Sequence, residues 1–375
     1  MHYFDNSATT AVLPEAVEVM TKLMLTDFGN PSSQHSMGIK AAKELKNYRE
    51  IVAKAMGANA DEITFTSGGT EAINTAIFGA AHKNRHMGKH IITTEFEHSA
   101  VKNACKRLEE EGFAVTYLKP DETGHISAED FENALRQDTV LVSIMLVNNE
   151  VGTLQPVEKI GSILKAKAPR AIFHIDAVQG FFRTALTPKK WNCQLMSVSG
   201  HKIGAPKGIG ALYISRDIKI RPYIVGGGQE KGMRSGTEPM PSIAGFGVAC
   251  EIRQKNMADD LKHVNELAEY LKSQLESRIP WAKQNGQPDV PHVFNVSLEG
   301  CKSEVMLRIL ESREVYVSAG SACAKGKESA VLKAMGFDNK RIDSAIRISF
   351  APFNTKEDID ALLDGFEQGI KMLKR

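Results

Sequence analysis

The stretch "SVSGHKIGAPKGIGALY", residues 197–213, decides how the rest of the chain is interpreted. A short apolar strand ends at Ser199, and Lys202 follows it at the start of a turn rich in Gly, Ala and Pro. A solvated surface lysine needs no such setting, whereas a lysine that must form and break a covalent bond does. The pattern therefore marks Lys202 as a candidate for covalent chemistry at a strand end.

The sequence before this stretch alternates strand-like and helix-like segments, which predicts an α/β fold. Strand ends recur about every 25 residues, a period typical of βα units. Apolar runs such as "LVSIMLV" (141–147) are typical of strands covered on both faces, and hence of a parallel sheet. Such sheets bind ligands at the carboxyl ends of their strands. The predicted strands are residues 62–66, 90–94, 114–118, 139–147, 171–176 and 194–199.

A change of composition after these strands predicts a second domain. Residues 224–239, "IVGGGQEKGMRSGTEP", are too rich in Gly and charge for a core element, and a long helix is expected from about Pro241 to Ser277. The remainder reads as a smaller α+β unit. We expect a large domain over residues 13–250, and a small domain formed by residues 1–12 and 251–375.

The bulk composition is that of an ordinary globular protein, with 375 residues, 42% of them hydrophobic and 25% charged. Because 47 basic and 45 acidic residues leave a net charge of +2, nothing indicates direct nucleic-acid binding. No apolar run suggests a membrane span, and the start "MHYFDNSATT" does not resemble a secretory signal. The odd count of five cysteines, without a CxxC pair, predicts a reducing cytoplasm and neither disulfides nor a metal site.

Polar residues follow the predicted strands at the edge where a ligand would bind. The segment "TSGGTEAIN" (66–74) places glycines before a helix that begins near Thr70, an arrangement that suits a phosphate. Taken singly, each of these residues has an ordinary structural explanation as a helix cap or turn former. The residues after the other strands are His98, Asn149, Asp176, Gln179, His201 and Lys202.

Together these residues are the parts of a pyridoxal phosphate site. Lys202 would form a Schiff base with the aldehyde of this cofactor, and Asp176 would stabilise the protonated pyridine nitrogen. The glycine-rich turn would bind the phosphate, and His98 would stack on the ring. A set that converges on one edge of one sheet is more specific than any one member of it.

The sequence resembles the cysteine desulfurases, which are pyridoxal-phosphate enzymes of the class V aminotransferase fold. The resemblance spans essentially the whole chain and implies an aspartate aminotransferase-like fold, with a mostly parallel seven-stranded sheet in the large domain. It also implies a homodimer. The motifs that carry it are "DNSATT", "FGNPSSQHSMG", "TSGGTEAIN", "EHSAV", "VNNEVG", "HIDAVQG", "SGHKIGAPKGIGALY", "GGGQEKGMRSGTEP", "SAGSAC" and "IRISF".

The resemblance implies a role for each matching residue. Lys202 would carry the cofactor, His98 would stack on it and shuttle protons, and Cys323 would be the nucleophile. Arg347 and Asn149 would bind the substrate, with Arg347 holding its carboxylate, as a planar two-donor group suits. The remaining cofactor contacts would come from Gly69, Thr70, Ser199 and His201 and from Thr237 of the partner subunit to the phosphate, from Asn149 and Gln179 to the phenolic oxygen, and from Asp176 to the ring nitrogen.

Cys323 also stands out without the resemblance. It lies in "SAGSACAKGKES" (318–329), a small and polar stretch whose lysines favour the thiolate form. The other four cysteines have helix-like, apolar or turn contexts, for which inert packing or surface placement is expected. They are Cys105, Cys193, Cys250 and Cys301.

We therefore expect a cysteine desulfurase that converts L-cysteine to L-alanine and holds the sulfur as a persulfide on Cys323. The alternatives are another class V enzyme, such as a selenocysteine lyase or a transaminase, and a non-catalytic sulfur-transfer scaffold. A transaminase has no need of Cys323, and the intact Lys202, Asp176 and His98 argue against a scaffold. The acceptor stays open between iron–sulfur cluster assembly and tRNA or cofactor thiolation.

Overall fold

The structure, a computed structural model, describes residues 1–320 and 328–373. Among these residues, seven strands form one sheet in the order β2-β8-β7-β6-β5-β3-β4. Neighbouring strands from β7 to β4 run parallel, and β8 runs antiparallel to β2 and β7. The predicted mostly parallel seven-stranded sheet is therefore confirmed. The strands are β2 (Ile63–Thr66), β3 (His90–Thr94), β4 (Ala114–Leu118), β5 (Thr139–Met145), β6 (Ile172–Asp176), β7 (Leu195–Ser199) and β8 (Gly210–Ile214).

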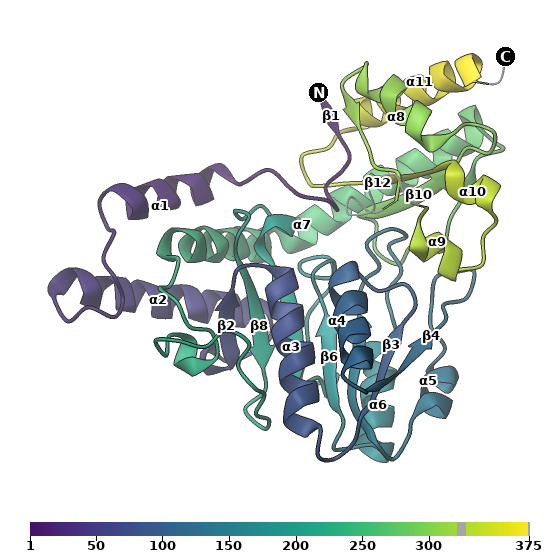
Figure 1. Ribbon diagram of the computed structural model, residues 1–375. Coiled ribbons are helices and arrows are strands. Elements are labelled where there is room, and N and C mark those ends of the chain that lie inside the picture. The colour runs from purple at the N-terminus through teal and green to yellow at the C-terminus, as the bar shows by residue number, and fades with distance from the viewer. Residues whose placement is uncertain (321–327, 374–375) are drawn as a thin grey trace.

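Helices cover both faces of this sheet (Figure 1). Helices α3 and α4 pack on one face, where Leu141 and Ile172 point, and α2, α6 and the first part of α7 pack on the other, with Val142 and Phe173. This alternation is why the central strands read as continuous apolar runs. The helices around the sheet are α1 (Pro14–Leu25), α2 (Ser36–Ala55), α3 (Gly69–Asn84), α4 (Ser99–Glu110), α5 (Ala128–Ala134), α6 (Val157–Lys167) and α7 (Met240–Arg278).

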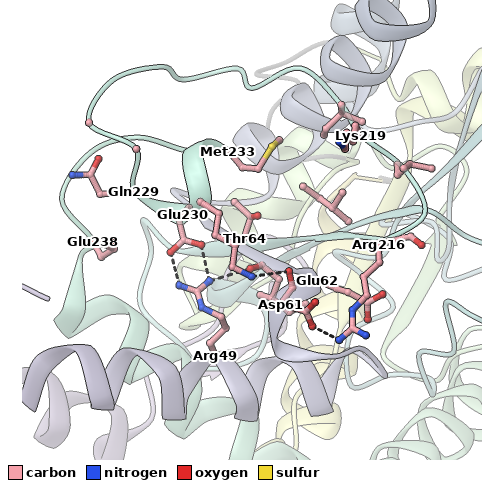
Figure 2. A pocket seen from close by; sticks show the side chains of 18 of the residues that line it. Arg49, Asp61, Glu62, Thr64, Arg216, Lys219, Gln229, Glu230, Met233 and Glu238 are labelled. Atoms are coloured by element: carbon pink, nitrogen blue, oxygen red, sulfur yellow. Dashed lines mark hydrogen bonds and ion pairs between the residues drawn. The ribbon is translucent and has the colours of Figure 1, made fainter. Parts of the chain in front are cut away.

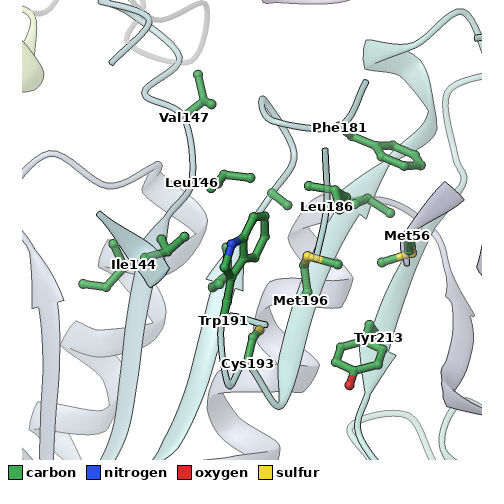
Figure 3. Packing of buried hydrophobic residues seen from close by; sticks show 14 of the residues in the cluster. Met56, Ile144, Leu146, Val147, Phe181, Leu186, Trp191, Cys193, Met196 and Tyr213 are labelled. Carbon is green, nitrogen blue, oxygen red and sulfur yellow. The ribbon is translucent and has the colours of Figure 1, made fainter. Parts of the chain in front are cut away.

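The second face holds the largest side chains of the core. Figure 3 shows Trp191 and Met196 beside Leu146 and Ile144 in this cluster. Strand β5 ends at Met145, two residues before the end of its apolar run. The reason is that Val147 instead forms a bridge with Leu154, which turns the chain at the sheet edge.

A smaller α+β unit follows the sheet and includes both chain ends (Figure 1). The N-terminal strand β1 pairs with β11, and β10 pairs with β12 and β9. Its core contains Phe4 together with apolar side chains of α7, α8 and α11. The elements are β1 (His2–Tyr3), β9 (Lys283–Gln284), β10 (Val293–Ser297), α8 (Ser303–Glu311), β11 (Val315–Tyr316), α9 (Ala330–Ala334), α10 (Asn339–Asp343), β12 (Ala345–Ser349) and α11 (Lys356–Leu373).

Helix α7 connects the two cores without a break. Phe246 and Cys250 pack beside the sheet, while Leu267 and Leu271 pack in the smaller unit. The domain boundary expected between residues 250 and 251 falls inside this helix and stays a prediction. In the described ranges, no helix combines the length and apolar character that a membrane span requires.

Candidate functional site

The carboxyl ends of the parallel strands meet around a cavity of about 220 Å³. Residues predicted from separate parts of the sequence line it together, because the strands that precede most of them share one sheet edge, while Arg347 comes from β12 of the smaller unit. The predicted residues that line the cavity are Gly69, Thr70, His98, Asn149, Asp176, Gln179, Ser199, His201, Lys202 and Arg347.

The turn between β2 and α3 forms the anion-binding end of the cavity. Gly68 has φ +148°, in the region that favours glycine. A Cβ on Gly69 would lie 2.9 Å from Cγ2 of Val178, so no side chain fits there without a shift. Helix α3 begins at Gly69, and its free N–H groups and dipole favour a phosphate at this point. Buried Ser199 lies on the same wall.

Asp176 is the buried acid of the site and ends strand β6. Its Oδ1 accepts a hydrogen bond from the Val178 backbone N–H at 3.0 Å. Burial raises the pKa of Asp176 to about 6, while the Val178 hydrogen bond and the charge of Lys202 oppose the rise. A cation bonded directly to this carboxylate would hold it ionised.

Lys202 ends a short 3-10 turn, Gly200–Lys202, directly after β7. Its Nζ donates hydrogen bonds to the backbone carbonyls of Ser7 at 2.5 Å and Ala8 at 2.8 Å. The carbonyl of His201 accepts hydrogen bonds from the backbone N–H and the hydroxyl of Thr10. The N-terminal segment therefore holds the lysine turn in place, and the Gly- and Pro-rich sequence follows the anchored part.

Two histidines of the site are neutral at pH 7. His98 caps helix α4 with its Nδ1, which accepts the backbone N–H of Ala100 at 3.1 Å, so its proton lies on Nε2. Burial first, and the charge of Lys202 second, lower the pKa of His98. The same two causes, with Lys207 as a third, lower the pKa of His201 to about 4.

A buried arginine orients Gln179. Arg183 donates a hydrogen bond from Nη1 to Oε1 of Gln179, and the Gln179 amide nitrogen donates to the Ser7 carbonyl at 2.9 Å. Because the amide oxygen faces Arg183, the NH₂ group is the end of Gln179 that a ligand oxygen would meet.

Arg347 also lines the cavity and is almost fully buried, with 1% of its surface exposed. Its guanidinium donates to the carbonyl of Asn149 at 3.0 Å and to Oδ1 of Asp5 at 2.8 Å. Nε of Arg347 has no hydrogen-bond partner among the described residues. A guanidinium has five N–H groups, so this charge is held in place with donors to spare for a carboxylate.

Several residues of the site were missed by reasoning from the sequence. The carbonyls of Ser7 and Ala8 and the carboxylate of Asp5 belong to "DNSATT", a motif that the resemblance includes but to which no role was given. Arg183 gave no signal, because only its distance to Gln179 in the fold marks it.

One predicted residue does not line this cavity, and another lies outside the described part of the chain. Thr237 is exposed on the loop before α7, away from the cavity of its own chain. Cys323 lies outside the described residues. The chain on either side of residues 321–327 is attached beside the cavity. Ser318 exchanges two backbone hydrogen bonds with Arg347, and the hydroxyl of Ser329 donates to Oε2 of Glu150 at 2.5 Å.

The other four cysteines are buried. Burial raises the pKa of Cys105 to about 12 and raises the pKa values of the Cys193 and Cys250 thiols as well, so these three stay protonated near neutral pH. Their environments agree with inert packing. Over residues 1–320 and 328–373, no group of three or more His, Cys, Asp or Glu side chains is placed to hold a metal ion.

The residues around the cavity fit pyridoxal phosphate. A turn that excludes side chains leads into a helix N-terminus, where a phosphate is favoured. Buried Asp176 has a raised pKa that a protonated ring nitrogen would lower. Lys202 lines the same cavity as these two groups and carries the amine that the cofactor needs.

Comparison with known proteins gives matches over nearly the whole chain. The model of the family described as "Aminotransferase class-V" matches residues 2–362. A protein named cysteine desulfurase IscS from Clostridium botulinum is 42% identical, over 98% of this chain and 94% of its own length. One of the same name from Methanosarcina thermophila is also 42% identical, over 99% and 92%.

Solved structures agree with these matches. A structure titled "NifS-like protein" has a TM-score of 0.94 and 38% identity and covers 99% of both chains. A structure titled "SspA in complex with cysteine" has a TM-score of 0.84 and 37% identity, and it covers 95% of this chain and 100% of its own.

Proposed function

Since the chain belongs to the class V aminotransferase family, and within it to the cysteine desulfurases, we propose that it transfers sulfur from L-cysteine through Cys323. L-Alanine is the other product, and pyridoxal phosphate is the cofactor. The observation that carries the proposal is the meeting of Lys202, Asp176, His98 and Arg347 around one cavity.

We assign each cofactor contact to a residue that lines the cavity, as the family resemblance implies. Gly69, Thr70, Ser199 and His201 would hold the phosphate, and Asp176 would bond the ring nitrogen. Asn149 and the NH₂ group of Gln179 would bond the phenolic oxygen, and His98 would stack on the ring. When bound, pyridoxal phosphate supplies an aldehyde that bonds amines and a ring that takes up the electron pair left at Cα.

Lys202 and Arg347 divide the work on the substrate. Arg347 binds the carboxylate of L-cysteine with the donors that Asp5 and Asn149 leave unused. Lys202 removes the Cα proton with its amine, from a position that the Ser7 and Ala8 carbonyls set. Because His98 is neutral with its proton on Nε2, it can donate that proton and recover it.

Cys323 takes the sulfur. Its thiolate attacks the sulfur of the substrate, so an S–S bond forms while the Cβ–S bond breaks. The electron pair of the broken bond stays with the substrate carbon, which is protonated and leaves as alanine. The anchors at Ser318 and Ser329 beside the cavity support this role. Cys323 is three positions after Gly320, and three residues of chain span at most about 11 Å.

The active unit is a homodimer. Helices α1 and α2 extend from the body of the molecule (Figure 1). Exposed apolar side chains gather on these helices and on the segment between them, namely Met24, Leu25, Phe28 and Ile39. Such a surface favours contact with another protein. Thr237, exposed and away from its own cavity, would then contribute to the phosphate site of the other copy.

The acceptor is a protein of iron–sulfur cluster assembly or of tRNA or cofactor thiolation. The name of the relatives at 42% identity favours the first. We place the enzyme in the cytoplasm, because Cys323 has to be a free thiol at the start of each turnover and thiols stay reduced there.

Product analysis tests the proposed function. The purified protein, supplied with L-cysteine and a reducing thiol, is expected to release alanine and sulfide in a 1:1 ratio. Release of pyruvate and ammonia, or transfer of the amino group to a keto acid without sulfide, would contradict it. Selenocysteine as sole accepted substrate would establish the lyase alternative instead.

A further inference from the structure

The loop before α7 is attached to the edge of the sheet by a buried ion pair. Glu230 accepts two hydrogen bonds from the Arg49 guanidinium, at 2.6 and 2.7 Å, and a third from the Phe65 backbone N–H at 3.0 Å. Arg49 also donates to the Ile63 carbonyl. Figure 2 shows this pair in the wall of a cavity of about 730 Å³. The pair therefore fixes the loop seven residues before Thr237.

A second ion pair joins the same loop to the phosphate-binding turn. Nε of Arg234 lies 3.1 Å from Oε1 of Glu71, and the other oxygen of Glu71 accepts the Ser67 backbone N–H at 3.0 Å. The two side chains are 22% and 9% exposed. Glu71 lies in the first turn of α3, and Ser67 is the residue that begins the turn Ser67–Thr70. One carboxylate thus contacts both the turn and the loop.

Arg234 lies three positions before Thr237 in the same loop. Hydrogen bonds hold the two intervening residues, since the Ser235 N–H donates to the Ile224 carbonyl at 3.1 Å and the Gly236 N–H donates to Oε1 of Gln229 at 2.9 Å. Arg234 and Thr237 are thus joined by a short segment whose backbone is fixed by hydrogen bonds. On the other side, an opening of about 470 Å³ is lined by Glu71 together with Gly69, Thr70, Ser199 and His201.

We infer that Glu71 and Arg234 are positioning residues that couple the two cofactor sites of the dimer. Each pair ties the phosphate-binding turn of its own subunit to the loop that this subunit lends to the other. The inference rests on the proposed dimer with a shared site. Phosphate bound at the turn fixes the Ser67–Thr70 backbone, whose Ser67 N–H holds Glu71, and Glu71 then holds the loop through Arg234 in the place where the second site needs it. By linkage, the effect works equally in the other direction.

Mixed dimers test this coupling. One subunit carries Lys202→Ala, so borohydride reduction retains pyridoxal phosphate covalently only in the other, working subunit. The retained cofactor is measured by mass spectrometry against cofactor concentration, which needs no turnover. Arg234→Met is placed either in the working subunit or in the Lys202→Ala subunit. In both arrangements we expect half-saturation at about tenfold higher cofactor concentration, because one charge-assisted hydrogen bond is lost.

Two substitutions serve as references. Thr237→Ala should weaken retention only when it lies in the Lys202→Ala subunit, because that subunit lends its loop to the working site. Arg216→Met removes an exposed partner of Asp61 in the same region and should change nothing in either arrangement. Glu71→Gln should reproduce Arg234→Met, and the double variant should be no worse than either single one.

The outcomes separate the two proposals. If Arg234→Met acts in only one arrangement, or in neither, while Thr237→Ala acts as expected, the coupling is refuted and the shared site stands. If Thr237→Ala has no effect in either arrangement, or if the wild type sediments as a monomer, the shared site and the coupling are both wrong. If an Arg234→Met dimer does not assemble, Glu71→Gln in the two arrangements decides in the same way.

Discussion

Replacement of Arg347 by lysine tests how the enzyme recognises its substrate. Lysine keeps the positive charge beside Asp5 but cannot present two parallel donors to a carboxylate. We expect Arg347→Lys to raise KM for L-cysteine strongly and to change kcat little, because the carboxylate contact is the same before and during the reaction.

The size of the effect follows from the buried position of the side chain. With 1% of its surface exposed, the guanidinium binds the carboxylate where little water competes. A hydrogen bond to a charged group contributes about 1.5–3 kcal/mol, and lysine loses one of the two. Loss of one such bond corresponds to a decrease of about 10- to 150-fold in kcat/KM.

The assay compares L-cysteine with cysteamine, which lacks the carboxylate. Binding of each to the holoenzyme is followed by the absorbance of the cofactor, in the wild type and in Arg347→Lys. The two proteins should bind cysteamine equally and L-cysteine very differently. Equal weakening for both ligands would mean that the substitution disturbs the site as a whole, and the assignment of Arg347 would be wrong.

Three further substitutions probe the acid and base groups. Lys202→Ala should abolish both the covalent link to the cofactor and turnover, and alanine release at the normal rate would disprove its role. Asp176→Asn should lower kcat by about 10²- to 10³-fold without lowering the unfolding free energy of the cofactor-free protein, since it removes a buried charge; unchanged kcat would count against the ring-nitrogen contact. Burial raises the pKa of Glu97 from 4.5 to about 8, so folding favours its protonated form, and the stability this provides below pH 4.5 is lost as pH rises toward 8. Ionisation of Glu97 should therefore lower the unfolding free energy by up to about 4 kcal/mol between pH 5 and 8, and Glu97→Gln should remove this contribution. Urea unfolding of the cofactor-free protein measures it, and an equal decrease in the wild type and the variant would refute the assignment.

The residues after the parallel strands were predictable because one rule places them. A parallel sheet brings the carboxyl ends of its strands to one edge, so Asp176 and Lys202 meet although each alone resembles a cap or a turn residue. The apolar runs predicted the strands for the same reason, since both faces of this sheet are covered.

The contacts that complete the site were not predictable from local pattern. Asp5 and Arg347 are 342 positions apart, and their ion pair depends on how β1 and β12 lie in the smaller unit. Lys202 is held by backbone carbonyls, and because every residue has one, the sequence does not indicate which carbonyls make these contacts. The orientation of Gln179 depends likewise on Arg183, whose burial only the fold reveals.

The most direct test of the account is the position of the sulfur after L-cysteine is added without an acceptor. Mass spectrometry of the digested protein should find one extra sulfur per subunit, on the peptide that contains Cys323. Cys323→Ser should bind L-cysteine with normal affinity and release almost no alanine, because a hydroxyl is a poor nucleophile toward sulfur. Sulfur on Cys105, Cys193, Cys250 or Cys301 of the Cys323→Ser variant, with alanine formed at the wild-type rate, would contradict the proposed mechanism.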